Sequence, residues 1–250
     1  MTSRLDRALV ERGLARSRAQ AQEAIRDLRV LVNGHQVARA SQPVLAGDAI
    51  ELSGGDHYVS RAAHKLLGAL AGSGVTVAGR VLDAGASTGG FTQVLLEAGA
   101  AKVYAIDVGH GQLVDELRAD PRVIVRERLN LRDLTLGHVD GEPVDLVVGD
   151  VSFISLRLLL APLLAVLAPT GAALLLVKPQ FEVGRGGLDD RGVVRDPVRR
   201  ARAVTDVAEA AAALGWHAAW QAESQLPGES GNLEYFLHLV PGTPDLATAG

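Results

Sequence analysis

The 250-residue sequence contains no cysteine. Disulfide bonds, thiolate metal sites and cysteine nucleophiles are therefore excluded, and the absence fits a reducing, cytoplasmic environment. The first residues, Met1 to Asp6, also lack the apolar stretch of a signal peptide. We expect a cytoplasmic protein and predict no metal site.

Lysine is the second scarce residue, since only Lys65, Lys102 and Lys178 occur beside 22 arginines. Arginine stays charged, whereas a buried lysine can give up its proton. Lys65 and Lys178 both lie in motif-like segments, where arginine could not replace lysine chemically. These two lysines are therefore candidate site residues.

A long uncharged stretch occurs at residues 158–177, which is about the length of a membrane span. Pro162, Pro169 and Gly171 interrupt it. We interpret it as a buried helix, a turn at 169–171 and a buried central strand. We therefore predict no membrane association.

The net charge of −4 is unevenly distributed. Residues 1–40 hold eight arginines against four acidic residues, a local balance of +4, which leaves −8 for the rest. Two short helices are expected at 3–13 and 17–28, the second with Ser17 as its N-cap, followed by strands at 30–34 and 47–52. The pattern predicts a small basic α+β domain over residues 1–55.

The segment Ser53-Gly-Gly-Asp56 leads into a linker at 56–59, and helix and strand signals then alternate through residues 60–250. This alternation predicts a doubly wound, mostly parallel α/β sheet with an antiparallel pair of strands at its end. The tail from Pro241 is expected to fray. The expected helices are 60–72, 89–98, 111–118, a leucine-rich segment after 156, and 197–214; the expected strands are 79–83, 102–107, 122–126, 144–150, 172–178, 216–223 and 233–240.

A turn of small residues follows the first of these strands, in the segment Asp83-Ala-Gly-Ala-Ser-Thr-Gly-Gly90. Small residues allow a ligand to approach the backbone, and a helix N-terminus offers free N–H groups. A pyrophosphate would be repelled by Asp83, whereas S-adenosylmethionine carries a sulfonium and an ammonium group. An ordinary glycine-rich turn is the alternative explanation for this segment alone.

Polar residues end three further predicted strands. Asp107 stands where an acid would bind the ribose hydroxyls of an adenosine cofactor, although it could also cap a helix. Asp150 and Lys178 end two neighbouring central strands and could form a structural ion pair. Glu234 lies in an apolar strand, where its carboxylate needs a cationic partner such as a lysine. Because ligands bind at the carboxyl ends of parallel strands, these residues should converge on one crevice.

Together these segments resemble the TlyA family of ribosomal RNA 2'-O-ribose methyltransferases, historically called haemolysins. The residues that carry the resemblance are Tyr58-Val-Ser-Arg61, Gly85-Ala-Ser-Thr-Gly-Gly-Phe91, Asp150-Val-Ser-Phe-Ile-Ser-Leu156, Val177-Lys-Pro-Gln-Phe-Glu182 and Ser230-Gly-Asn-Leu-Glu-Tyr-Phe236. Residues 60–250 resemble the FtsJ-like, Rossmann-like class I methyltransferases. Residues 1–55 resemble the arginine-rich RNA-binding module of ribosomal proteins, on the cues Arg4-Leu-Asp, Gly13-Leu-Ala-Arg-Ser-Arg18 and Val32-Asn-Gly34.

The resemblance implies a function and a set of site residues. The expected activity is S-adenosylmethionine-dependent 2'-O-methylation of a cytidine in 16S ribosomal RNA, 23S ribosomal RNA or both, with ribosomal RNA or ribosomal subunits as the partner. The sequence leaves the oligomeric state open, and a monomer is the default expectation. The implied catalytic tetrad is Lys65, Asp150, Lys178 and Glu234. The predicted cofactor-binding residues are Asp83, Gly85, Ala86, Ser87, Thr88, Gly89, Gly90, Phe91, Asp107 and Asn130. The predicted RNA-binding residues are Arg4, Arg16, Arg18 and Arg26.

The expected mechanism assigns Lys178 as the general base for the ribose hydroxyl, held by Asp150. Lys65 would stabilise the developing alkoxide, and Glu234 would orient one of the two lysines. Three other functions were weighed against this one. A dehydrogenase is disfavoured by the missing G-x-G-x-x-G, a membrane-lytic protein by the prolines within 158–177, and an RNA chaperone because it leaves Asp107, Asp150, Lys178 and Glu234 unexplained.

Overall fold

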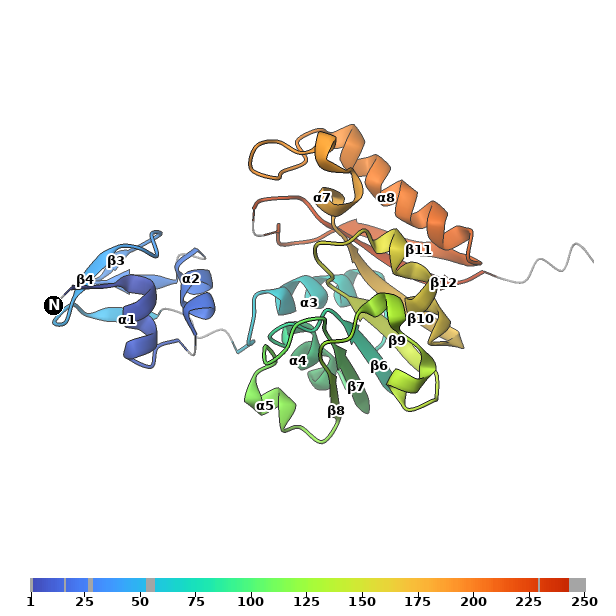
Figure 1. The fold of residues 1–250 in the computed structure, drawn as a ribbon, viewed down its shortest axis with the longest axis horizontal. Coiled ribbons are helices and arrows are strands. Elements are labelled where there is room, and N and C mark those ends of the chain that lie inside the picture. Colours follow the sequence, from blue (N-terminus) through green and yellow to red (C-terminus); the bar gives the residue numbers. More distant parts are fainter. Residues whose placement is uncertain (1, 16, 27–28, 53–56, 229, 243–250) are drawn as a thin grey trace, which may run out of the picture. The chain divides into compact units, whose positions relative to one another are not determined.

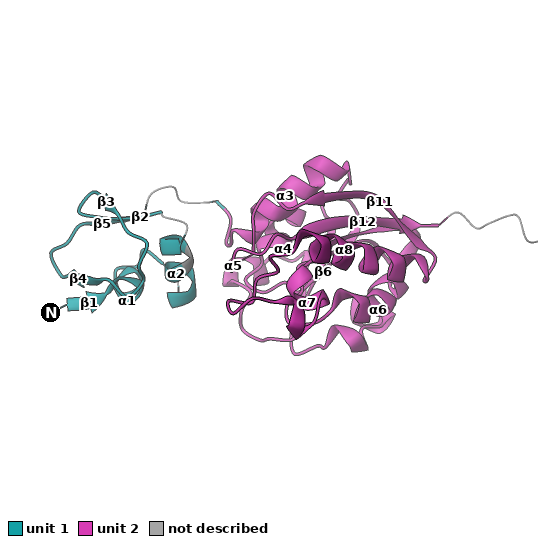
Figure 2. Cartoon of the chain, turned by 90° about the horizontal axis from the view of Figure 1, so that it is seen from above, with its two compact units in different colours: residues 1–57 teal, residues 58–250 magenta. Residues whose placement is uncertain are grey.

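The computed structural model describes residues 2–15, 17–26, 29–52, 57–228 and 230–242. The chain forms two compact units, residues 1–57 and 58–250, which Figure 2 colours separately. The segment 53–56, which includes the first residue of the expected linker at 56–59, and the tail 243–250 lie outside the described residues. Each unit is considered by itself below.

The first unit has two helices and two small sheets around one core. Its elements are β1 (Thr2–Arg4), α1 (Leu5–Glu11), α2 (Arg18–Arg26), β2 (Val30–Val32), β3 (His35–Gln36), β4 (Pro43–Leu45) and β5 (Ile50–Leu52). The predicted N-cap is confirmed, because the Ser17 hydroxyl accepts the Gln20 N–H at 3.2 Å. The short strands β1, β3 and β4 were not predicted, because two or three residues show no periodicity.

The second unit is built on a seven-stranded sheet with the order β11-β12-β10-β9-β6-β7-β8 (Figure 1). Its strands are β6 (Arg80–Ala84), β7 (Lys102–Ile106), β8 (Val123–Arg126), β9 (Val144–Gly149), β10 (Leu167–Val177), β11 (Trp216–Glu223) and β12 (Tyr235–Pro241). Strands β8, β7, β6, β9 and β10 are parallel, whereas β12 runs antiparallel to both β10 and β11. The prediction of a mostly parallel sheet with an antiparallel pair at its end is confirmed.

Helices cover both faces of this sheet. The helices are α3 (Ala62–Ser73), α4 (Gly90–Glu97), α5 (Asp115–Arg118), α6 (Leu160–Ala165), α7 (Pro179–Glu182) and α8 (Pro197–Ala212), and the short 3₁₀ turns are η1 (Leu131–Asp133), η2 (Leu136–Val139), η3 (Leu156–Leu158) and η4 (Arg185–Gly187). Apolar residues of α3, α4 and α5 pack with one set of strand residues, and those of α6 and α8 pack with the other set. Alternate residues of each strand supply the two cores, as in Leu174 and Leu175.

The uncharged stretch 158–177 folds as α6 and β10, so it belongs to the core of the second unit. Within the described ranges, no helix is both long enough and apolar enough to span a bilayer. The predicted turn at 169–171 is wrong, because β10 runs through these residues with an irregular register between Leu167 and Ala172. After β10, Lys178 is extended and a short helix begins at Pro179, which occupies the first helical position.

Candidate active site

The predicted site residues meet at one edge of the parallel sheet. Asp107, Asp150 and Lys178 directly follow β7, β9 and β10, and Asp83 is the fourth residue of β6. The strand order reverses beside β6, since the chain places β7 on one side and β9 on the other. This is the position where doubly wound sheets open a crevice for ligands.

Lys178 is held by two side chains from the loop after β9. Its Nζ lies 2.6 Å from Asp150 Oδ1 and donates a hydrogen bond to Ser152 Oγ at 2.7 Å. The predicted proximity of Lys178 and Asp150 is therefore present as an ion pair. Both side chains remain slightly exposed at the edge of the sheet, 10% and 15% respectively. The ammonium group is fixed but can still be reached by a substrate.

Lys65 and Glu234 form a second ion pair, with Nζ and Oε2 2.6 Å apart. Both side chains are buried, at 6% and 2% exposure. Gln180 Nε2 donates to the other carboxylate oxygen of Glu234 at 2.9 Å. Glu234 thus orients Lys65, which settles the alternative left open by the sequence. Gln180 follows Lys178 by two residues, so the hydrogen bond connects the two ion pairs.

Glu182 joins the loop after β9 to the segment after β10. It accepts hydrogen bonds from the Ser155 hydroxyl and the Leu156 N–H, both at 2.6 Å. Arg157 adds an ion pair at 3.2 Å. These contacts close the loop that carries Asp150 and Ser152 against α7. The two segments that flank Lys178 are therefore fixed relative to each other.

The turn between β6 and α4 requires its glycines. Gly85 has φ +85, and a Cβ there would lie 3.1 Å from the Asp150 carbonyl oxygen. Gly89 has φ +103, and a Cβ there would collide with a methyl group of Leu117. Neither conformation nor space suits a larger residue. The turn therefore brings bare backbone to the crevice beside Asp150.

Asp83 is fully buried at the base of this turn. One carboxylate oxygen accepts the Thr92 hydroxyl at 2.7 Å, whereas the other has no partner in the part of the chain that the structure describes. The pKa of Asp83 is raised to about 7, chiefly by burial; the hydrogen bonds from Thr92 oppose the rise, and the nearby Asp150 and Asp107 charges add to it. An unpartnered buried carboxylate oxygen is costly, and a bound cation would satisfy it.

Asp107 binds the backbone of the turn after β6 and of the loop after β7. Its Oδ2 accepts the Ser87 N–H at 2.9 Å, and its Oδ1 accepts the Gly109 N–H at 2.7 Å. Ser87 itself has φ +48, a left-handed conformation that this hydrogen bond helps to hold. Each oxygen keeps a further lone pair for a ligand hydroxyl. Asp107 therefore shapes the turn and remains available to a cofactor.

The other predicted cofactor-binding residues differ in which of their groups a cofactor could contact. Phe91 is buried and stacks on Phe236 with ring centroids 6.3 Å apart, so only its backbone at the start of α4 faces the turn. Asn130 is exposed, and its side chain accepts the Arg132 N–H at 3.0 Å, which caps η1. Ala86, Thr88 and Gly90 lie within the turn or at the first position of α4.

Phe153 is an unexpected feature beside Lys178. It is 91% exposed and has φ +65, a strained conformation for an aromatic residue. Its ring lies 5.3 Å from that of Phe181, centroid to centroid. The neighbouring residue, Ser152, binds Lys178. An exposed apolar ring beside charged groups is typical of a surface that binds a flat, partly apolar ligand.

The predicted RNA-binding arginines lie in the first unit, apart from Arg16, which lies outside the described residues. Arg4 and Arg18 both bind Asp6 and are 51% and 60% exposed. Arg26 is exposed in the last turn of α2. Their roles in RNA binding stay predictions.

Four residues of the site were missed from the sequence: Ser152, Phe153, Gln180 and Glu182. All four lie inside the two segments that carry the family resemblance, Asp150–Leu156 and Val177–Glu182, and that membership was the only available signal. No group of three or more histidine, aspartate or glutamate residues within the described ranges is arranged to hold a metal ion. The site therefore offers acids, lysines and backbone amides.

Comparisons with known proteins match both units of the chain to known families. The model of the FtsJ-like methyltransferase family matches residues 58–240, and that of the S4 domain matches residues 3–50. The 16S/23S rRNA (cytidine-2'-O)-methyltransferase TlyA of Mycobacterium tuberculosis is 51% identical over 240 residues, which cover 95% of this chain and 89% of that protein.

Two further proteins are similar along most of their length. The 23S rRNA (cytidine-2'-O)-methyltransferase TlyA of Campylobacter jejuni is 36% identical, with 92% of this chain and 97% of that protein covered. A solved structure from Streptococcus thermophilus, described as a hemolysin, is 36% identical with a TM-score of 0.77, and the match covers 96% of this chain and 89% of that one.

Proposed function

Because this chain belongs to the TlyA family of FtsJ-like methyltransferases, we propose that it methylates the 2'-hydroxyl of a cytidine in ribosomal RNA with S-adenosylmethionine as methyl donor. The observation that carries the proposal is the pair of ion pairs, Lys178–Asp150 and Lys65–Glu234, joined through Gln180. They lie at the same sheet edge as the glycine turn and Asp83.

The residues of the turn fit S-adenosylmethionine. The unpartnered oxygen of Asp83 suits the ammonium group of the cofactor, and the free lone pairs of Asp107 suit its ribose hydroxyls. The positive φ of Gly85 and Gly89 leaves the backbone accessible. When bound, the cofactor supplies an electrophilic methyl group on a sulfonium sulfur.

Lys178 acts as the general base in this proposal. Its Nζ, in the unprotonated form, accepts the proton of the ribose 2'-hydroxyl. The oxygen freed of its proton would then be the nucleophile for the methyl group that a bound S-adenosylmethionine supplies, with the neutral thioether as leaving group. Asp150 and Ser152 hold Nζ in place, so that the hydroxyl and the methyl group can align.

Lys65 stabilises the negative charge that develops on the ribose oxygen. Its ammonium group is positioned before the reaction by Glu234, and a charge fixed in advance in a poorly hydrated site is effective in the transition state. Gln180 keeps Glu234 in the orientation that faces Lys65. The four residues thus combine one base with one fixed cation.

Phe153 supports the choice of a nucleotide as substrate. A ribose whose 2'-hydroxyl reaches Lys178 belongs to a nucleotide removed from its neighbours, and its exposed base needs a stacking partner. The ring of Phe153 is exposed and contacts that of Phe181, and the preceding residue, Ser152, binds Lys178. We infer that the base of the target nucleotide stacks on Phe153.

The first unit would bring the enzyme to its RNA. The S4 domain match covers the segment in which Arg4, Arg18 and Arg26 lie. Exposed guanidinium groups bind phosphates without regard to sequence and so position the protein on folded RNA. The acidic second unit then needs only to recognise the target nucleotide.

The proposal is tested by transfer of a tritiated methyl group from S-adenosylmethionine to isolated 30S and 50S ribosomal subunits. The names of the relatives differ in whether they include 16S RNA, so both subunits are needed. We expect label on the 2'-oxygen of a cytidine, and no label with Lys178→Ala. Methyl transfer by Lys178→Ala at the wild-type rate would contradict the assignment of Lys178 as the general base. If the wild type binds the cofactor but transfers no label, ribosomal subunits are not its substrate.

A further inference from the structure

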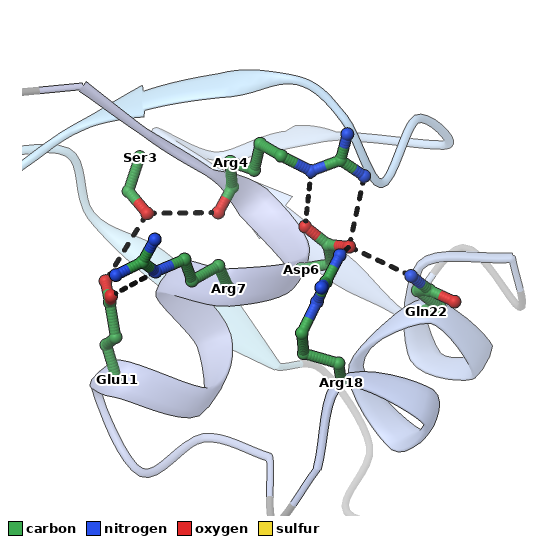
Figure 3. Close-up of polar contacts among 7 residues, drawn as sticks. All are labelled: Ser3, Arg4, Asp6, Arg7, Glu11, Arg18 and Gln22. Atoms are coloured by element: carbon green, nitrogen blue, oxygen red, sulfur yellow. Dashed lines mark hydrogen bonds and ion pairs between the residues drawn. The ribbon is translucent and has the colours of Figure 1, made fainter.

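Asp6 is a buried carboxylate surrounded by cationic and polar side chains in the first unit. Arg4 donates to it through Nε at 3.1 Å and Nη2 at 3.2 Å, and Arg18 donates through Nη2 at 2.9 Å. Gln22 adds a fourth hydrogen bond at 2.9 Å. Figure 3 shows all three side chains pointing toward Asp6. We call Arg4, Asp6, Arg18 and Gln22 the Asp6 cluster.

The members of the Asp6 cluster differ sharply in exposure. The Asp6 side chain is completely buried, whereas those of Arg4 and Arg18 are 51% and 60% exposed. Hydrogen bonding to Arg4 in particular holds the pKa of Asp6 well below its usual range, so the carboxylate stays charged. The cluster therefore has a buried anion beneath two cations that reach the surface.

The two guanidinium groups keep most of their donors. A guanidinium has five N–H groups, of which Asp6 takes two from Arg4 and one from Arg18. Two free guanidinium groups would repel each other, but the shared carboxylate holds them side by side. The remaining N–H groups match the non-bridging oxygens of a phosphodiester, which guanidinium groups bind with directed, charge-assisted hydrogen bonds.

The elements that carry the cluster explain how it is fixed. Arg4 ends β1, Asp6 lies in the first turn of α1, and Arg18 and Gln22 lie in α2. Asp6 therefore sets the position of arginines from two separate elements. A second network on the same helix offers a contrast: Glu11 pairs with Arg7 at 2.7 Å, but both are exposed and held by one turn of helix.

We propose that Asp6 is a positioning residue that holds Arg4 and Arg18 together as a clamp for one phosphodiester of the substrate RNA. This inference rests on the proposed function, since it takes RNA as the ligand. Asp6 itself does not touch the RNA and acts through the two arginines. The clamp supplies contact without sequence preference and leaves recognition of the cytidine to the other unit.

The test compares Asp6→Asn with Glu11→Gln in the full-length protein. Each removes one negative charge from α1, so electrostatics alone would make both variants bind RNA more tightly. The clamp predicts the opposite for Asp6→Asn, with affinity for deproteinised 16S and 23S RNA falling about tenfold. The slope of log affinity against log salt should also decrease by about 1 to 2. Affinity is measured by filter binding at several salt concentrations.

A double-variant comparison separates positioning from a merely structural role. In a protein that already carries Arg4→Gln and Arg18→Gln, Asp6→Asn should cause no further loss of RNA affinity. A further loss of tenfold there would overturn the proposal, as would RNA binding by Asp6→Asn alone that is as tight as wild type.

Arg18→Lys decides the question if Asp6→Asn does not fold, which its thermal melting would reveal. This change keeps the charge at an exposed position but removes the forked donor geometry. We expect weaker RNA binding, and unchanged binding would overturn the clamp. S-adenosylmethionine affinity should stay at the wild-type value throughout. Because binding is measured without catalysis, a wild type that binds RNA but transfers no methyl group would contradict the proposed function alone.

Discussion

The Lys65 ammonium and the Glu234 carboxylate lie 2.6 Å apart although 169 positions separate them in the sequence. One comes from the helix before the first strand of the sheet, and the other from the loop before the last strand. Their ion pair therefore depends on the complete second unit. Two of the four proposed catalytic residues are therefore brought together only when this unit has folded.

Glu234→Gln should lower the stability of the protein and also slow methyl transfer. The substitution leaves the buried Lys65 ammonium without its counter-ion, and breaking a buried pair in this way costs about 3 kcal/mol. Urea unfolding should show this loss in the free energy of unfolding. Glu223→Gln, at an exposed position of β11, is the matched control and should change it by less than about 0.5 kcal/mol. Equal stabilities of the two variants would contradict the prediction.

Phe153→Gly should stabilise the folded protein and weaken its use of the RNA substrate. Glycine accepts φ +65 without strain, which is worth about 1 kcal/mol for a residue in the left-handed region. Loss of the ring removes base stacking, so KM for the RNA should rise about tenfold while cofactor affinity stays constant. Thermal melting and steady-state kinetics measure the two effects. Phe153→Tyr keeps the ring and should keep KM, and an unchanged KM in the glycine variant would exclude the stacking role.

The affinity for S-adenosylmethionine should fall as the pH falls below about 7. Burial raises the pKa of Asp83 to about 7, and a protonated Asp83 cannot bind the ammonium group as an ion pair. Each pH unit below this value should weaken binding by up to about tenfold. Calorimetric titrations from pH 5.5 to 7.5 would measure the slope. Asp83→Asn should bind weakly with no slope, and a flat profile in the wild type would rule out this role.

The same shift has an opposite effect on the stability of the cofactor-free protein. Between pH of about 4 and 7, folded Asp83 holds a proton that the unfolded chain has released. Its contribution to stability is therefore complete below pH of about 4 and is lost as the pH rises through 7. Asp83→Asn should remove this contribution, which denaturant unfolding at several pH values would show.

Asp107→Asn should weaken cofactor binding by about 10- to 100-fold. The carboxylate accepts N–H groups of Ser87 and Gly109 with its two oxygens, and the amide would turn a donor toward one of them. An unpaired N–H in this turn costs about 1 to 3 kcal/mol. Equilibrium dialysis with S-adenosylmethionine measures the change. Asp115→Asn, in α5, is a control that should bind normally, and equal affinity of the two variants would contradict the prediction.

Much of the second unit could be predicted, because its strands are apolar runs that end in polar residues. Asp107, Asp150 and Lys178 were correctly placed at strand ends, since the parallel order brings these ends to one edge. The partner of Glu234 could not be chosen from the sequence. Two lysines were available, and the register of β12 on β10 brings Glu234 close to Lys178. The packing of α3, which carries Lys65, decides the pairing in favour of Lys65.

The missed features share a different cause. Ser152, Gln180 and Glu182 act through hydrogen bonds to groups from other segments, and a sequence carries no signal for such partners. The residues of the predicted turn at 169–171 continue β10 with a local irregularity, because pairing with neighbouring strands overrides the turn preference of proline and glycine. Phe153 gave no sign of exposure, since phenylalanine is usually buried.

The insertion of β12 between β10 and β11 has a consequence for synthesis of the protein. On the ribosome, β11 is made before β12, yet it pairs in the sheet with β12. The edge of β10 and the edge of β11 that pair with β12 therefore stay without a strand neighbour until β12 has left the exit tunnel. Unpaired strand edges invite aggregation. A nonsense mutation upstream of residue 235 should therefore yield an insoluble polypeptide rather than a soluble inactive enzyme.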